Sequence, residues 1–265
     1  LAAVGGDLIL ESLQDTSSYH SSQQSSGCSF SVGFGKGSAS ASAAGSQIDS
    51  HYRSVVERTG LLAGDGGFDV RVKGDTTLTG AVIASTEAAV LANRNRFDTD
   101  GTLTLANLQN EARYKASSYS VHLSTSNSSP NTTGGFQLQG NSAGIGRDSD
   151  HAASTTTAGI SGLAGNTAVR TNDAPTGIDK IFDANRVQKE IDAQAQITQL
   201  FGQKASQAVG DYAQEKMREA TQLRLQGKIA EAEAIEAQWG SSGSLRLAAH
   251  TAIGALTGGT SGAAG

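Results

Sequence analysis

One line of sequence occurs twice in this chain, and this repeat constrains the fold more than any other feature. The first copy consists of Gly6, Leu8, Leu10, Leu13, Gln14, Tyr19, Ser22 and Ser25. The same residue types recur 95 positions later without a gap, as Gly101, Leu103, Leu105, Leu108, Gln109, Tyr114, Ser117 and Ser120. The leucines alternate within each copy, which is the period of a strand with one buried face. A fixed period is the signature of repeat architectures, so we predict a stacked β-solenoid.

The composition agrees with a solenoid and argues against some partners. Charged residues make up 17% of the chain, against roughly 25% in typical domains. The 33 glycines and abundant Ser, Thr, Asn and Gln suit tight corners. The net charge is −5 without a basic run, which argues against nucleic acid as a partner. The single cysteine, Cys28, excludes an internal disulfide and a multi-cysteine metal site.

Residues 1–146 form the first predicted region, a β-solenoid with Ser/Gly-rich excursions. Its strongest strand pattern is at Phe68, Val70 and Val72, which alternate with charged residues. The tracts 17–50 and 124–143 lack dense apolar patterning, and we expect loops or irregular hairpins that leave the solenoid. The two copies bracket residues 68–85, and each copy is followed by a nearly charge-free tract. The repeated unit is therefore expected to be one rung plus one polar excursion.

The rest of the chain is expected to be a linker, a helical segment and a tail. The linker covers 147–177, and the helical segment covers 178–238 after a start signal at 171–173. Gly202 and Gly210 each weaken a helix and are candidate breaks, whereas Gly227 is expected to end the run. The residues expected on the packing face of the helix are Val187, Ile191, Ile197, Phe201, Val209 and Tyr212.

Residues 239–265 are predicted to be a Gly/Ala-rich apolar tail. The apolar run 245–256 is shorter than the ~20 residues that a spanning helix needs. Gly254, Gly258 and Gly262 recur at a spacing found in membrane helices, so membrane association of the tail is left open. The chain begins at Leu1 without a signal-like segment and ends in this tract, so we expect a piece of a longer protein.

The sequence contains no catalytic constellation, and we predict no cofactor. The five histidines are scattered, and none stands at metal-ligand spacing. Asp98 and Asp100, followed by Gly101, are a weak calcium candidate, because several calcium loops begin in this way. A downstream glutamate at loop spacing is missing, so a polar turn before the strand at Leu103 is favoured.

Several longer segments of this chain resemble one known family. They are 13–16 with 23–25, 62–70, 80–85, 109–116, 159–166 and 181–198, and the resemblance extends over nearly the whole chain. Their order resembles the filamentous-haemagglutinin repeat region, in particular the late repeats of contact-dependent growth inhibition effectors of Gram-negative bacteria. The chain lacks that family's N-terminal secretion domain and its Val-Glu-Asn-Asn motif.

The resemblance implies a secreted or cell-surface exoprotein with a β-helical filament and a periplasmic stage before delivery. Its implied partners are a two-partner secretion transporter of the outer membrane, the target-cell outer membrane or its proteins, and a C-terminal toxin in cis. It implies a non-enzymatic scaffold and translocation segment, with any toxin activity downstream.

Two other functions are weighed beside delivery. The first is a filamentous adhesin that binds a cell-surface glycan or protein. The second is a solenoid polysaccharide lyase or hydrolase, for which Asp69, Asp75, Asp98 and Asp100 are too few and too dispersed.

Overall fold

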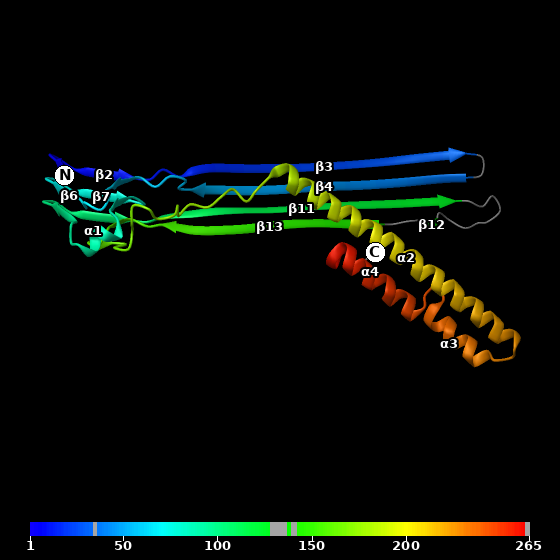
Figure 1. Cartoon of the computed structure of the whole chain (residues 1–265). Coiled ribbons are helices and arrows are strands. Elements are labelled where there is room, and N and C mark those ends of the chain that lie inside the picture. Colours follow the sequence, from blue (N-terminus) through cyan, green and yellow to red (C-terminus); the bar gives the residue numbers. More distant parts are fainter. Residues whose placement is uncertain (34–35, 128–136, 139–141, 263–265) are drawn as a thin grey trace. The chain divides into compact units, whose positions relative to one another are not determined.

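The computed structural model of the chain describes residues 1–265 except 34–35, 128–136, 139–141 and 263–265 (Figure 1). Its contacts divide the chain into two units. The first unit contains Leu1–Tyr19, Asp49–Tyr114 and Ser149–Phe182. The second unit contains His20–Ile48, Lys115–Asp148 and Asp183–Gly265.

The first unit is built on three sheets of parallel strands. One sheet holds β1 (Ala2–Val4), β6 (Asp69–Val72) and β9 (Arg96–Thr99). The next holds β2 (Leu8–Glu11), β7 (Thr76–Thr79) and β10 (Leu103–Ala106). The third holds β5 (Gly60–Leu62), β8 (Val82–Ala84) and β14 (Gly159–Ile160), with β15 (Ala164–Gly165) antiparallel to β14. The chain therefore passes through the three sheets in the same order three times.

The two copies of the repeat occupy equivalent positions on either side of the middle pass. Leu8 of β2 and Leu103 of β10 both pair with Thr76 of β7. Leu10 and Leu105 both pair with Leu78 in the same way. The offset of 95 in the sequence thus corresponds to two passes through the sheets in one register.

The core of this unit lies between the three sheets. Leu78 of β7, Ile83 of β8 and Ile160 of β14 are completely buried, and they belong to one apolar cluster. The predicted apolar face at residues 68–72 is confirmed, because Val70 and Val72 are only 2% and 3% exposed within the same cluster. Alternation of apolar and charged residues in β6 therefore places one face in the core and the other in water.

Four long strands form a separate sheet, and each has residues in both units. They are β3 (Asp15–Gly33), β4 (Lys36–Ser54), β11 (Leu108–Asn127) and β13 (Ser142–Thr156). The sheet order is β12-β11-β4-β3, where β12 is Gln137–Leu138, and β13 also pairs with β11. Figure 1 shows that the long strands alternate in direction.

The expectation of loops or irregular hairpins over 17–50 is wrong, because β3 and β4 are regular strands. Main-chain pairing needs no apolar side chains, so hydrophobic patterning misses such strands. The second tract, 124–143, lies largely outside the described residues. The expected linker 147–177 also differs from the structure, since it contains the end of β13 together with β14 and β15.

The predicted helical C-terminal segment is present, with different boundaries. After the short α1 (Glu87–Leu91), the helices are α2 (Ala184–Leu225), α3 (Ile229–Trp239) and α4 (Ser244–Gly262). The start signal lies at Asp183, whose side chain accepts a hydrogen bond from the Arg186 amide at 2.7 Å. Asp173, the expected signal, instead accepts from the amide of Arg170. Gly227 ends the run as predicted, with a φ of 78°.

Helix α2 runs without a break through Gly202 and Gly210, so neither glycine ends it. A Cβ atom at Gly202 would lie 3.0 Å from Cγ2 of Thr257 in α4, so this glycine permits a close helix contact. Helix α4 occupies most of the predicted tail. Among the described residues, no helix is long and apolar enough to cross a membrane. The three sheets are open, so the predicted solenoid stays a proposal.

Candidate functional site

The most informative site is the corner at which two excursions, one with β3 and β4 and one with β11 and β13, leave the three sheets. Ser12, Gly80 and Asn107 follow directly on the paired strands β2, β7 and β10 at equivalent positions. Gly80 has a φ of 58° and leads straight into the third sheet. The Ser12 hydroxyl accepts from the amide of Thr59, 47 positions later, at 2.9 Å. Asn107 Oδ1 accepts from the amide of Ala158, 51 positions later, at 2.9 Å. One side chain therefore holds the returning end of each excursion, Ser12 for the first and Asn107 for the second.

The repeated glycines lie at another corner of the same passes. The amide of Gly101 donates to the carbonyl of Gly74 (3.1 Å), and that of Gly74 donates to the carbonyl of Gly6 (3.0 Å). The carboxylate of Asp7 accepts from the amide of Asp75 at 2.8 Å. The carboxylate of Asp75 accepts from the amide after Gly101 at 2.6 Å. Side-chain oxygens thus add bonds between successive passes.

The repeated glutamines lie at the base of the two excursions. Gln14 Nε2 donates to the carbonyl of Gln109 (2.7 Å) and to Oδ1 of Asn110 (3.2 Å). Asn110 is 1% exposed, and its Oδ1 also accepts from the amide of Val55 at 2.9 Å. Its Nδ2 donates to the Thr156 hydroxyl at 2.9 Å. Because a buried amide is costly unless it is hydrogen-bonded, this residue helps to fix both excursions to each other.

The repeated tyrosines contact one phenylalanine. The ring centroids of Tyr19 and Tyr114 lie 5.3 Å and 5.6 Å from that of Phe182. We had expected Phe182 to be in a helix, but it precedes α2. The repeated leucines behave differently from each other, since Leu13 is 80% exposed whereas Leu108 contacts the corner at Gly80.

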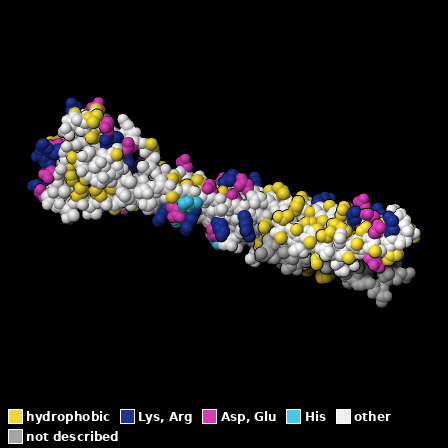
Figure 2. Space-filling model, turned by 90° about the horizontal axis from the view of Figure 1, so that it is seen from below, with side chains coloured by type: hydrophobic (Ala, Val, Ile, Leu, Met, Phe, Trp, Pro, Cys, Tyr) yellow, Lys and Arg dark blue, Asp and Glu magenta, His cyan; other side chains and the backbone are white. Residues whose placement is uncertain are grey.

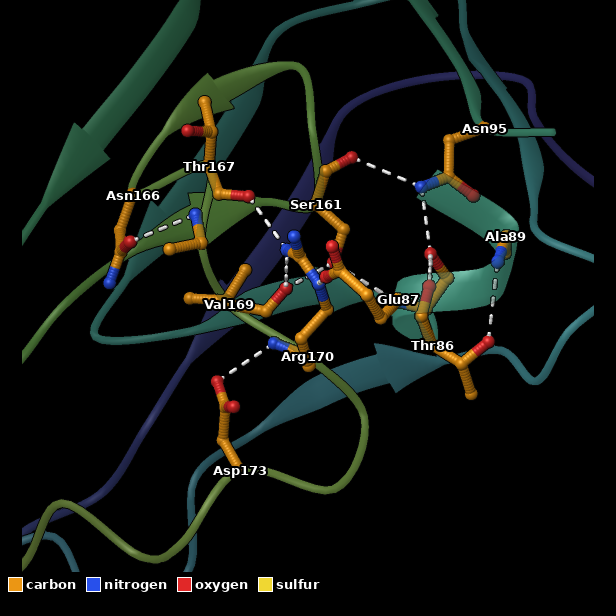
Figure 3. Close-up of polar contacts among 12 residues, drawn as sticks. Thr86, Glu87, Ala89, Asn95, Ser161, Asn166, Thr167, Val169, Arg170 and Asp173 are labelled. Atoms are coloured by element: carbon orange, nitrogen blue, oxygen red, sulfur yellow. Dashed lines mark hydrogen bonds and ion pairs between the residues drawn. The ribbon is translucent and has the colours of Figure 1, made fainter. Parts of the chain in front are cut away.

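A polar network covers the segment after β8 and β14 (Figure 3). Asn95 Nδ2 donates to Ser85 Oγ (2.7 Å) and to the carbonyl of Ser161 (3.1 Å). Arg170 forms an ion pair with Glu87 of α1. These groups bond to one another and to the main chain. The network therefore stabilises this end of the third sheet.

The calcium candidate lies at the end of β9. Asp98 is in β9, Asp100 follows the strand directly, and both are exposed. Arg71, which is in register with Asp98, forms its ion pair with Asp69 at 3.2 Å. Within the part of the chain that the structure describes, no three His, Cys, Asp or Glu side chains converge on a metal position. Cys28 is exposed.

The predicted packing face of α2 is only partly buried. Val187 and Ile191 are completely buried. Val209 is half-buried, and Tyr212 is 45% exposed with its ring centroid 4.7 Å from that of Trp239. Ile197 and Phe201 are 66% and 50% exposed. The other buried positions of α2 carry small residues, namely Ala195, Gly202, Ala213 and Ala220.

The reason for small residues is a close approach of main chains. A Cβ atom at Gly146 of β13 would collide with the carbonyl oxygen of Ile191, and one at Gly144 with that of Ala195. The hydroxyl of Ser118 in β11 donates to the same Ile191 carbonyl at 2.8 Å. The face of α2 therefore packs on a lane of glycine and serine, which a search for large apolar residues does not find.

Ion pairs join the helices on their exposed sides. Arg224 of α2 contacts Glu236 of α3 at 2.7 Å. This hydrogen bond lowers the pKa of Glu236 and raises that of Arg224. The hydrogen bond from Lys216 to Glu219 raises the pKa of Lys216. Because these groups are in water, salt screens the pairs.

Large apolar side chains remain exposed in the helical segment. Leu225 is 85% exposed, Leu256 68% and Leu247 66%. Figure 2 shows hydrophobic side chains gathered over the part of the molecule that holds the helices. Apolar area in water is unfavourable by roughly 25 cal/mol per Å².

Comparison with known proteins is consistent with the repeat. Residues 5–121 match the family model of the haemagglutinin repeat. The tRNA nuclease CdiA of Escherichia coli strain NC101 is 37% identical over 226 residues, which is 77% of this chain and 6% of the relative. The Deoxyribonuclease CdiA of Dickeya dadantii is 44% identical over 128 residues, which is 48% of this chain and 4% of the relative. No solved structure matches the chain.

The chain thus spans only a small part of these relatives, 6% and 4% of their lengths. The activities in their names belong to those whole proteins and carry no information about residues of this chain. The predicted resemblance itself is confirmed by the family model and by the sequence identity. Residues 5–121 are therefore a haemagglutinin repeat region, and the chain is similar to a part of CdiA proteins.

Proposed function

We propose that this chain is a non-enzymatic scaffold and delivery segment of a larger secreted toxin, and that its three passes are coils of a β-solenoid. The observation that carries the proposal is the register of the repeat. Both copies pair with β7 at the same positions, and both carry an excursion at the same corner. A stack of coils that displays paired hairpins is a scaffold for contact with another surface.

The surface of the excursions supports a role in presentation. Strands β3, β4 and β11 are rich in serine. Strand β11 also exposes Tyr119, Val121 and Leu123, and exposed apolar side chains of this kind suit contact with another surface. The proposed partners are an outer-membrane secretion transporter, the outer membrane of a target cell, and a toxin domain in cis. The proposed location is the surface of a Gram-negative bacterium or its surroundings.

The test removes an excursion and leaves the coils in place. In a full-length effector, residues 12–58 are replaced by one glycine, which copies the direct turn at Gly80–Ala81. We expect normal secretion and surface display, measured with antibody on intact cells, and a loss of target-cell killing. The matched control is Gly64→Ala, which leaves both excursions intact and places a Cβ where it meets nothing within 4 Å. Killing at the wild-type rate by the displayed deletion variant would contradict the delivery role.

The same strains separate delivery from adhesion. Binding between inhibitor and target cells is counted by flow cytometry before killing begins. Normal cell binding with lost killing supports delivery. Loss of binding together with killing favours the adhesin.

A further inference from the structure

A short irregular segment connects the sheets of the first unit to the helices. We call residues 174–182 the strap. The strap has no helix or strand, and none of its residues is classed as buried. It contacts the base of both excursions through main-chain and side-chain polar groups and one aromatic ring.

Polar contacts join the strap to both excursions. The amide of Ile178 donates to the Ser54 hydroxyl at 2.8 Å, and the hydroxyl of Tyr52 donates to the Ile178 carbonyl at 3.0 Å. The hydroxyl of Thr176 donates to that of Thr156 at 2.9 Å. Ser54 and Tyr52 end the first excursion, and Thr156 ends the second. The strap therefore bonds to both excursions.

The aromatic contact repeats this arrangement. Phe182 contacts Tyr19 of β3 and Tyr114 of β11, which are the same position in the two copies of the repeat. One ring at the end of the strap thus requires both excursions to be in place. Loss of one tyrosine leaves the contact between Phe182 and the other tyrosine, whereas loss of both removes both ring contacts.

The strap and the sheets differ in how far their apolar side chains are buried. The sheets bury Leu78, Ile83 and Ile160 completely, whereas Phe182 is only half-buried. Segments with few buried apolar contacts and exposed main chain open at lower free energy than the core. We propose that the strap is a latch that opens as one unit while the three sheets stay folded.

Trypsin tests the latch in the whole 265-residue protein. Lys180 is exposed within the strap, and an opened strap offers the bond after it for cleavage. When opening is fast relative to cleavage, the cleavage rate follows the population of the open form. We expect the double variant Tyr19→Ala/Tyr114→Ala to be cleaved after Lys180 about tenfold faster than the wild type. The fragment 1–180 should persist. Tyr119→Ala is the control, because this exposed tyrosine of β11 lies outside the strap contacts.

Two results would overturn the latch. One is an unchanged rate of cleavage after Lys180 in the double variant. The other is degradation of the fragment 1–180 as fast as it forms, because the strap would then open only with the sheets. If circular dichroism shows that the double variant is unfolded, Tyr52→Phe decides instead. This change deletes one hydrogen bond to the strap and keeps the ring, and it should raise the cleavage rate severalfold.

Discussion

The three sheets of the first unit and the helical part of the second unit bury their main chains in opposite ways. The sheets use alternating branched side chains, with Val70, Leu78 and Ile83 in one cluster. The helix α2 instead meets the strands through Gly144 and Gly146, where a carbonyl occupies the space of a side chain. Large apolar residues at a regular period indicate the core of the sheets. The contact of α2 with the strands depends instead on small residues, which leave room for main-chain atoms.

The sharpest test of this comparison removes side-chain volume from the coil core. Leu78→Ala should lower the stability of the first unit by about 3 kcal/mol, because it opens a cavity between three sheets. Hydrogen exchange at the amides of β7 and β8 measures this loss. The only tryptophan, Trp239, is in α3, so its fluorescence reports on the second unit. The unfolding transition seen by this fluorescence should stay unchanged. Leu13→Ala, at an 80% exposed position, should change stability by less than about 0.5 kcal/mol.

The converse test adds volume where the helix meets the strands. Gly146→Ala should destabilise the docking of α2 by about 2 kcal/mol, since its new methyl group collides with the Ile191 carbonyl. The measurement is hydrogen exchange of residues 187–199. Gly210→Ala is the matched control, because a Cβ there meets nothing within 4 Å. It should stabilise α2 by about 0.8 kcal/mol. Equal effects of the two changes would contradict the glycine lane.

A smaller effect is expected at the corner that carries an excursion. Asn107→Ala removes the acceptor for the amide of Ala158, and it should lower stability by about 1 to 2 kcal/mol. The faster exchange should be confined to β14 and to the end of β13. Asn107→Asp keeps the acceptor and should retain most of the stability. Exchange that spreads to β7 would show that the corner and the core are not separate.

The smallest effect concerns pH and the exposed pair of Arg224 and Glu236. Its hydrogen bond lowers the pKa of Glu236 below the ordinary value of 4.5. The pair therefore contributes stability above pH 4.5, and the contribution is lost as the pH falls through the lowered pKa of the folded state. Exchange in α3 should rise in this window. Glu236→Gln should abolish that pH dependence, and high salt should weaken it. If Glu236→Gln keeps the same pH dependence of exchange, another titrating group is responsible for that dependence.

The sequence allowed prediction of strands where large residues repeat at a fixed period. Leu8, Leu10 and their copies indicated two equivalent strands, and the structure places both beside β7. The arrangement of one rung plus one excursion was also expected, because each copy precedes an uncharged tract. These features are local or repeat at a constant offset, so a single sequence contains enough information to detect them.

The parts that could not be predicted depend on distant main-chain contacts. No hydrophobic pattern in the sequence predicts the pairing of β4 with β11. Phe182 looked like a helical position, because nothing local indicates that Tyr19 and Tyr114 meet it. Ile197 and Phe201 were placed on the packing face since they are large, although small residues make the contact.

At the corner with Ser12 and Asn107, the length of the inserted segment does not affect the pairing of the strands before it. One insert returns after 47 positions and the other after 51, yet each ends on the same kind of bond to an amide. Loop closure becomes only slowly more costly with length, and here the closing contact belongs to the coil. This corner is thus an insertion port, at which hairpins of different length and sequence can be exchanged while the registers of β2, β7 and β10 stay as they are.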